Sequence, residues 1–210
     1  MKLYDYFRSS AAYRVRIALN LKGLVAEHVF VHLRQGAQHS ADFPALNPQG
    51  LVPVLAIDDD AVLTQSLAII EWLEETHPEP PLLPGSAAER ARIRAIALAI
   101  ACDIHPLNNL RVTDYLGSEL EQSQSSIDAW RRHWILKGGL EAVERMIAPA
   151  PFCFGASPTL ADVFLVPQLY SARRFATPLE QLPKILAVEA ACAELPAFRA
   201  AHPSMQADAE

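Results

Sequence analysis

The sequence predicts an α/β N-terminal part followed by an all-helical C-terminal part. Short apolar strand patterns alternate with amphipathic helix patterns between Leu3 and Leu73. A proline-dense stretch, residues 77–86, follows and cannot form the interior of a helix or strand. Every strongly periodic segment after it is helical. We therefore expect two domains, residues 1–79 and 87–210, joined by that linker.

A pair of serines separates the first strand from the first helix. Apart from Asp5, residues 3–7 are apolar or aromatic, and Val15 and Leu19 lie at helical spacing further on. Ser9 and Ser10 are good N-cap residues. A helix start also favours a bound anion, and a thiolate held there has a lowered pKa. Ser9 is therefore either a simple cap or a donor to an anion, and this stretch alone favours the cap.

The next elements complete the N-terminal part. Residues 28–33 form a second strand, parallel to the first because a helix joins the two. A polar loop, residues 35–40, leads to an apolar strand at residues 51–55. A turn at Asp58–Asp60 and a short strand at residues 61–63 then form a hairpin. The order from the residues alone is βαβ, a loop, then ββα.

Two positions in this part could expose backbone groups to a ligand. Pro53 is either a cis proline that leaves the Val52 backbone open for pairing, or a trans proline at a strand edge. A helix follows Gln65, and we expect Ser66 to be its N-cap. The free N–H groups at that helix start, with the Ser66 hydroxyl, could hold a carboxylate.

The helical part contains a polar cluster around Pro106, which we expect to kink its helix. His105 and Asn109 are four residues apart and would share one face. They form either a buried hydrogen-bond network or part of a site, but no spacing suggests a metal. Further on, a capping box at residues 159–162 opens a buried helix that ends near Arg173 and Arg174. Those arginines either bind carboxylates or favour the helix C-terminus.

The remaining helical segments carry fewer signals. We expect one helix over residues 127–148 and a last helix over residues 183–195. We expect the tail after Pro203 to be disordered.

Composition narrows the possible partners and location. A net charge of −6 argues against general nucleic-acid binding. The three cysteines, Cys102, Cys153 and Cys192, form no CxxC pair, which favours a reducing cytoplasm and no metal site. The N-terminus begins in a strand pattern rather than a signal peptide. The longest apolar run, residues 96–102, is far shorter than the roughly 20 residues of a membrane helix.

Three groups of motifs run along the chain. They are Phe7-Arg8-Ser9-Ser10 with Arg14-Val15-Arg16-Ile17-Ala18-Leu19, Asn47-Pro48 with Val52-Pro53 and Gln65-Ser66-Leu67-Ala68-Ile69-Ile70-Glu71, and Asp103-Ile104-His105-Pro106-Leu107-Asn108-Asn109 with Leu165-Val166-Pro167-Gln168 and Arg174. Together they resemble the zeta class of the cytosolic glutathione transferases over nearly the whole chain. The resemblance implies a thioredoxin-like N-terminal domain of order βαβαββα, an all-α C-terminal domain and a homodimer.

The resemblance also implies glutathione as the cofactor. Ser9 would hydrogen-bond the glutathione thiolate, and the Val52 backbone beside a cis proline would pair with the cysteinyl part. Gln65 and Ser66 would hold the γ-glutamyl end, and Gln38 the glycyl end. Asp103 would reach the glutathione amine of the other subunit. The implied cofactor-binding residues are Ser9, Ala11, Gln38, Gln49, Val52, Pro53, Gln65, Ser66 and Asp103.

The class isomerises maleylacetoacetate or its analogue maleylpyruvate from cis to trans. A thiolate adds to the activated double bond, the resulting single bond rotates, and the thiolate leaves, so glutathione is regenerated. Arginines would receive the carboxylates of this small dicarboxylate, and backbone N–H groups or an arginine would stabilise the enolate. The implied catalytic residues are Ser9, Ser10, Arg8 and Arg174, and the implied substrate-binding residues are Arg8, His105, Asn109, Arg111 and Arg174.

One position departs from the class. Ala11 stands where many members have Cys, in Ser-Ser-Cys, so bound glutathione is the only nucleophile to which the sequence points. Two other functions stay open at this point. The chain could be a general transferase that conjugates electrophiles or dehalogenates α-halo acids, or a non-catalytic binding protein of the same fold. Turnover of a maleyl substrate with no consumption of glutathione would separate the three.

Overall fold

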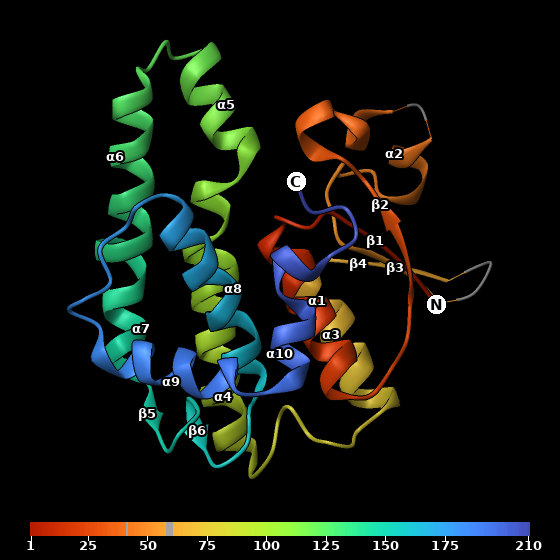
Figure 1. Cartoon of the computed structure of the whole chain (residues 1–210), viewed down its shortest axis with the longest axis vertical. Coiled ribbons are helices and arrows are strands. Elements are labelled where there is room, and N and C mark those ends of the chain that lie inside the picture. The colour runs from red at the N-terminus through yellow and green to blue at the C-terminus, as the bar shows by residue number, and fades with distance from the viewer. Residues whose placement is uncertain (41, 58–60) are drawn as a thin grey trace. The chain divides into compact units, whose positions relative to one another are not determined.

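The computed structural model describes residues 1–40, 42–57 and 61–210, which form two compact units (Figure 1). The first unit consists of Met1–Pro81 together with Ala193–Glu210, and the second of Leu82–Cys192. Between Thr76 and Ala87 the chain forms no helix or strand. We expected all of residues 87–210 to form one domain. The structure differs, because the last 18 residues, Ala193–Glu210, pack with the N-terminal unit.

A four-stranded sheet of order β2-β1-β3-β4 forms the base of the first unit. The predicted parallel pairing is confirmed, with β1 (Lys2–Asp5) beside β2 (Glu27–Phe30). On its other side β1 pairs antiparallel with β3 (Val54–Ala56), which forms the predicted hairpin with β4 (Val62–Thr64). The turn expected at Asp58–Asp60 lies outside the described residues.

The helices of the first unit complete the thioredoxin-like order βαβαββα. They are α1 (Ser10–Leu21), α2 (Phe43–Leu46) and α3 (Ser66–Thr76), together with α10 (Pro196–Ala201) from the C-terminal segment. Helix α1 packs against both α3 and α10, which Figure 1 shows beside it. Its buried face includes Val15, Ile17 and Ala18, none of which is exposed to solvent. The apolar spacing read from the sequence therefore faces a real core.

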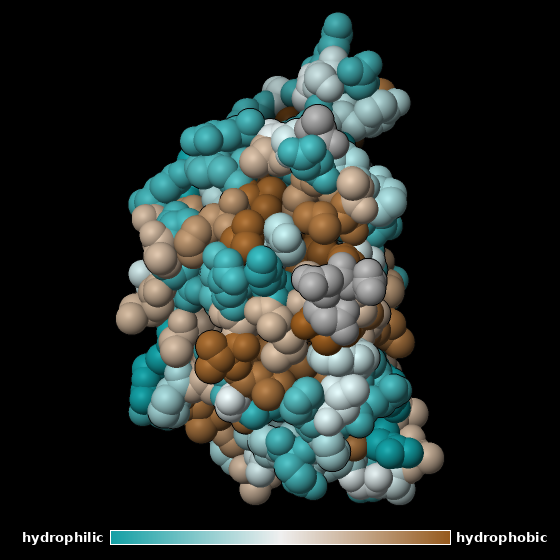
Figure 2. All heavy atoms as spheres, turned by 90° about the vertical axis from the view of Figure 1, so that its right-hand side faces the viewer, coloured by the Kyte–Doolittle hydropathy of each residue, from teal (hydrophilic) through white to brown (hydrophobic). Residues whose placement is uncertain are grey.

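The sheet edges of the first unit expose some apolar surface. Three large apolar side chains are exposed here, Val25, Phe30 and Val62, the last two on the edge strands β2 and β4. Figure 2 views this side of the molecule, where brown apolar atoms lie among teal polar ones.

The second unit is mostly helical, as expected. Its helices are α4 (Ala87–Leu98), α5 (Leu110–Ser118), α6 (Gln124–Ile135), α7 (Glu141–Met146), α8 (Leu160–Arg174) and α9 (Pro183–Ala193), the last ending where the first unit resumes. A two-residue ladder between β5 (Ala148–Pro149) and β6 (Phe154–Gly155) interrupts them. Helix α8 is buried over most of its length and packs against α4.

Two predicted helices are interrupted by π-helical turns. The expected helix over residues 127–148 is divided into α6 and α7 by a π turn at Leu136–Leu140. Helix α4 likewise runs into a π turn at Ala99–Ile104, then a 3₁₀ turn at Pro106–Asn108. A π turn adds a residue to one turn without altering the apolar periodicity on either side, so the pattern did not reveal it.

The C-terminal prediction was wrong in two respects. The helix expected over about residues 183–195 is α9, Pro183–Ala193, but it is not the last helix, because α10 follows it. The tail was expected to be disordered, but Pro203–Met205 form a 3₁₀ turn and Asp208 hydrogen-bonds to the N-terminal unit. Tertiary hydrogen bonds to distant residues order this tail, and local composition does not report them.

Candidate functional site

Ser9 lies in the turn between β1 and α1 and caps the helix. Its backbone is extended, and its Oγ accepts a hydrogen bond from the Ala12 N–H at 3.2 Å. The backbone N–H of Ser9 donates to the Tyr6 carbonyl at 2.9 Å, which closes the turn. Ser9 is half-buried, and its hydroxyl keeps its own proton to donate. The predicted cap is confirmed, and the Ser9 hydroxyl can still donate a hydrogen bond to an anion.

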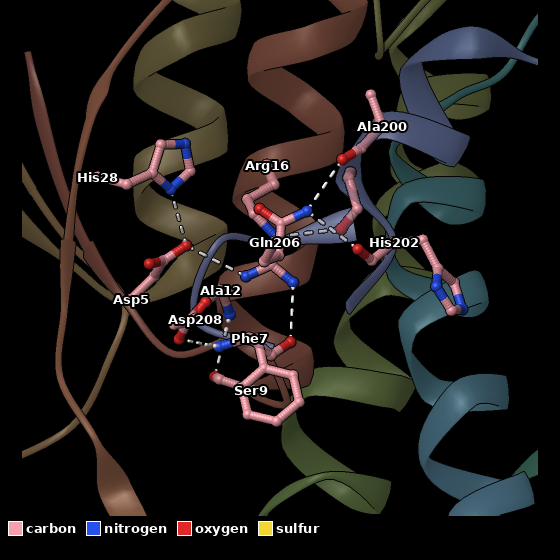
Figure 3. Close-up of polar contacts among 11 residues, drawn as sticks. Asp5, Phe7, Ser9, Ala12, Arg16, His28, Ala200, His202, Gln206 and Asp208 are labelled. Carbon is pink, nitrogen blue, oxygen red and sulfur yellow. Dashed lines mark hydrogen bonds and ion pairs between the residues drawn. The ribbon is translucent and has the colours of Figure 1, made fainter. Parts of the chain in front are cut away.

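A buried guanidinium lies beneath this turn. Arg16 donates from Nη1 to Asp5 at 3.1 Å and from Nη2 to the Phe7 carbonyl at 3.0 Å (Figure 3). Burial lowers the pKa of Arg16, and the Asp5 carboxylate opposes that effect. Asp5 also contacts His28 Nδ1 at 3.2 Å. The buried cation is thus paired, and it fixes the end of β1 relative to the turn.

The loop before β3 packs against the same turn. The Val52–Pro53 peptide bond is cis, which answers the question that the sequence left open. No residue that the structure describes hydrogen-bonds to the backbone N–H or C=O of Val52. A cluster of buried apolar side chains joins this loop to the turn, and its members are Tyr6, Phe7, Val31, Phe43, Val52 and Val54. The cluster therefore holds the turn that carries Ser9 and the loop that carries the Val52 backbone together.

The start of α3 has no side-chain cap. Gln65, not Ser66 as expected, is the N-cap, and its side chain makes no cap hydrogen bond. Its backbone has φ 67°, a strained value for a residue with a Cβ, and such strain of about 1–3 kcal/mol clusters at functional sites. Its Nε2 donates to Gln49 Oε1 at 2.6 Å, so two expected cofactor residues meet. The free N–H groups of α3 therefore remain available to an anion.

Two further buried polar side chains of the first unit are Arg14, which contacts that helix start, and Gln38. Arg14 is buried and donates from Nη1 to Ser66 Oγ at 3.2 Å, which leaves the serine proton free to donate elsewhere. Gln38 Oε1 is buried and has no hydrogen-bond partner among the described residues. A Cβ on Gly50 would come within 3.4 Å of the Gln38 carbonyl, so the two loops are close neighbours. An unsatisfied buried amide oxygen is costly unless a ligand completes it.

The polar cluster of the second unit differs from its prediction. His105 and Asn109 do not share a helix face, because the chain turns into a 3₁₀ helix at Pro106 and Asn109 has extended backbone. Asn109 instead caps α5, accepting from the Arg111 N–H at 3.1 Å. Asp103 and Arg111 are exposed, whereas His105 is half-buried. The position of Asn109 is thus explained by its role as the α5 cap, and the exposed Asp103 and Arg111 lie on either side of it in the sequence.

The end of α8 brings an unexpected arginine beside an expected one. Arg174 lies at the last turn with its guanidinium carbon 5.3 Å from the Phe175 ring centroid. Arg131 of α6 approaches the same ring at 4.6 Å, and its Nε is buried without a partner in the described part of the chain. The sequence did not single out Arg131, because an isolated arginine on an amphipathic helix resembles a solvated one. In the first unit, Arg8 lies over the Phe7 ring at 4.8 Å.

Two of the protein's three thiols are buried and are poor nucleophiles. Burial raises the pKa of both Cys153 and Cys192, with Asp162 adding to the effect. Cys102 is exposed on the π turn, away from the Ser9 turn in sequence and unit. Among the described residues, no group of three or more His, Cys, Asp or Glu side chains could hold a metal ion. No described helix is both long and apolar enough to span a membrane.

Comparison with known sequences adds decisive information. The family "Glutathione S-transferase, N-terminal domain" matches residues 8–76, and "Glutathione S-transferase, C-terminal domain" matches residues 124–207. A maleylpyruvate isomerase of Ralstonia sp is 50% identical, with 99% of each chain covered. A holo structure of a bacterial maleyl pyruvate isomerase of the zeta class is 49% identical, covers 100% of both chains and has a TM-score of 0.96. The chain is a zeta-class glutathione S-transferase.

A third relative of this transferase shows a ligand. The solved maleylacetoacetate isomerase of Anaeromyxobacter dehalogenans 2CP-1, with bound GSH in the active site, is 44% identical to it. The alignment covers 100% of this transferase and 97% of that chain, with a TM-score of 0.90. The same isomerase has also been solved with dicarboxyethyl glutathione and citrate bound in its active site.

Proposed function

We propose that this transferase is a glutathione-dependent cis–trans isomerase of maleylacetoacetate or maleylpyruvate. The observation that carries the proposal is the β1–α1 turn, where Ser9 keeps a free proton at a helix start in a chain about half identical to such isomerases. The substrate class also agrees with the dicarboxyethyl group on the glutathione bound to one relative. The enzyme would act in the cytoplasm as a homodimer, in keeping with its unpaired cysteines and the exposed apolar residues on its sheet edges.

The described residues fit glutathione. The open backbone of Val52 can pair with a peptide, and the uncapped start of α3, with Gln65 and Ser66, can bind an α-carboxylate. The buried Gln38 Oε1 lacks a partner and can accept from a ligand N–H, with Gln49 alongside Gln65. Each expected part of the tripeptide thus has a matching group in the first unit. Asp103, in the second unit, would reach the glutathione amine of the other subunit.

Bound glutathione would supply a thiol that adds reversibly to the conjugated double bond and lets it rotate. The Ser9 hydroxyl would donate a hydrogen bond to the glutathione sulfur and so keep the sulfur ionised near neutral pH, aided by the α1 dipole. Arg8, Arg111 and Arg174 would hold the two carboxylates of the substrate. The enolate would be stabilised by the N–H groups of Ser10 and Ala11 or by an arginine.

The test compares Ser9→Ala with Ser157→Ala, a control at an exposed loop position. We expect Ser9→Ala to lower kcat/KM for maleylpyruvate by about 10²-fold and to raise the pKa of the enzyme-bound glutathione thiol. The thiol is followed by the ultraviolet absorption of the thiolate, and turnover by loss of the cis substrate. The control should match the wild type in both.

The same assay separates the rival functions. An isomerase leaves total glutathione unchanged while the cis substrate disappears. Glutathione consumption with α-halo acids, together with no turnover of either maleyl compound, would instead establish a general transferase. No turnover of any of these substrates would favour a binding protein, and unchanged kinetics in Ser9→Ala would remove Ser9 from the mechanism.

A further inference from the structure

The C-terminal segment, Ala193–Glu210, reaches the turn that carries Ser9. Asp208 Oδ2 accepts a hydrogen bond from the Phe7 N–H at 3.0 Å, across 201 positions of sequence (Figure 3). The other carboxylate oxygen, Oδ1, is buried and has no hydrogen-bond partner among the residues that the structure describes. The Asp208 carboxylate is therefore committed to one backbone group of the turn.

Phe7 is held at both of its backbone polar groups. Its N–H donates to Asp208, and its carbonyl accepts from Arg16 at 3.0 Å. Arg16 also donates from Nε to the Ala201 carbonyl at 3.1 Å, so the same guanidinium binds the C-terminal segment. Asp208 further opposes the burial that lowers the Arg16 pKa. Asp208, Arg16 and the Phe7 peptide groups thus form one connected unit.

The segment is anchored on both sides of Asp208. Before it, Gln206 Nε2 donates to the carbonyls of Ala200 and His202, both at 2.9 Å. After it, Glu210 pairs with His32 and Arg34, and the hydrogen bond from His32 lowers the pKa of Glu210. Two anchors fix where the Asp208 carboxylate lies, so its contact with the turn is not that of a loose end.

We propose that Asp208 is a positioning residue for Ser9. It fixes the Phe7 peptide plane, two residues before Ser9, and thereby sets the direction of the Ser9 hydroxyl. This inference rests on the proposed role of Ser9 toward the glutathione sulfur. Misplacement of a reacting group by about 1 Å can cost 10²-fold in rate, so a second anchor on this turn has a catalytic consequence.

Geometry and charge predict opposite results at this position. A carboxylate near a thiolate disfavours the ionised sulfur, so loss of the Asp208 charge alone would lower the pKa of the bound thiol. Loss of the hydrogen bond would instead release the turn and weaken the Ser9 donor, which raises that pKa. The direction of the change therefore identifies which effect Asp208 exerts.

The experiment uses Asp208→Ala and Asp208→Asn in the full chain. The asparagine amide oxygen can still accept from the Phe7 N–H, but it carries no charge. We expect Asp208→Ala to raise the bound-thiol pKa and lower kcat/KM for maleylpyruvate by about tenfold to a hundredfold. Asp208→Asn should restore most of both. Glu194→Ala, which removes an exposed carboxylate from the same C-terminal segment, should behave as the wild type.

A second measurement keeps this test separate from that of Ser9. Amide hydrogen exchange at Phe7 should be faster in Asp208→Ala than in Asp208→Asn or the wild type, whatever Ser9 does. Equal exchange in all three, a lowered thiol pKa, or identical kinetics for the two Asp208 variants would overturn the inference. A third outcome is also informative: Asp208→Ala speeds amide exchange at Phe7, but Ser9→Ala does not change the pKa of the bound thiol. Asp208 would then anchor the turn without acting on the thiol through Ser9, which would refute the proposal as stated.

Discussion

Asp162 is buried with no exposed surface, yet its carboxylate accepts three hydrogen bonds. The donors are the Cys153 N–H at 2.8 Å, the Thr159 N–H at 2.7 Å and the Thr159 hydroxyl at 2.8 Å. Burial raises the pKa of Asp162, and these hydrogen bonds oppose it. The pairing with Thr159 could be read from the sequence, because the two residues have capping-box spacing. The bond to Cys153 could not, because no local rule joins residues nine positions apart through a turn.

At this scale we expect Asp162→Ala to be strongly destabilising. The substitution leaves two buried backbone N–H groups and a buried hydroxyl without an acceptor, at a cost of about 2–4 kcal/mol in the free energy of unfolding. Urea denaturation followed by circular dichroism measures it. Asp162→Asn keeps one acceptor oxygen and should lose about half as much. A loss below that of an ordinary exposed cap would contradict this account.

Two π turns, Ala99–Ile104 and Leu136–Leu140, pack against each other in the second unit. The sequence located both helical segments and the disruption at Pro106, because apolar periodicity and proline chemistry act locally. It could not show that His105 and Asn109 separate, since they do so through the 3₁₀ turn at Pro106–Asn108 and the extended backbone of Asn109, where the chain leaves one helix and begins the next. The close packing of Gly139 against Ile104 likewise joins two distant segments, so no local sequence pattern could predict it.

Gly139 gives a prediction for this contact between elements. A Cβ there would lie 2.4 Å from both Cγ1 and Cδ1 of Ile104, which is fully buried, and 3.0 Å from the Trp134 carbonyl. We expect Gly139→Ala to lower the free energy of unfolding by about 1–3 kcal/mol through overpacking. Gly117→Ala is the control, because its Cβ would meet only Ile127 Cδ1 at 3.5 Å and alanine favours the helix. Thermal denaturation of the two variants should shift in opposite directions, and a gain in stability for Gly139→Ala would refute the tight contact.

Both ends of the chain contribute to one unit of the molecule. Helix α10 packs on α1, and its Phe198 and Ala201 are almost fully buried there. The sequence predicted the two parts and the mixed sheet, because motifs and periodicity carry that information, and the glutathione-binding residues that it names stay a prediction. It grouped the last residues with the helical part, whereas Ala193–Glu210 pack with the first unit, because periodicity shows that a face is buried without showing which surface buries it. The anchoring of the Ser9 turn by Asp208 was missed for the same reason.

The return of α10 to the first unit predicts a localised loss of stability. Phe198→Ala opens a cavity against α1 and should destabilise the first unit by about 3–5 kcal/mol. The three tryptophans report separately, with Trp72 on α3 and Trp130 and Trp134 on α6. The measurement uses variants that keep either Trp72 alone or the two α6 tryptophans alone, so that fluorescence reports on one unit at a time. In Phe198→Ala the Trp72 fluorescence should report unfolding at a lower urea concentration than in the parent, with a smaller shift for the α6 tryptophans.

The control for that measurement is Val25→Ala, since the Val25 side chain is 87% exposed and should change stability by no more than about 0.5 kcal/mol. A shift confined to the α6 tryptophans would place α10 with the helical unit after all. A shift confined to Trp72 carries the opposite meaning: the last residues of the chain stabilise the unit that holds Ser9. In that case any change that weakens α10 also reaches the turn that carries Ser9, because Ala201 and Phe7 share the Arg16 guanidinium.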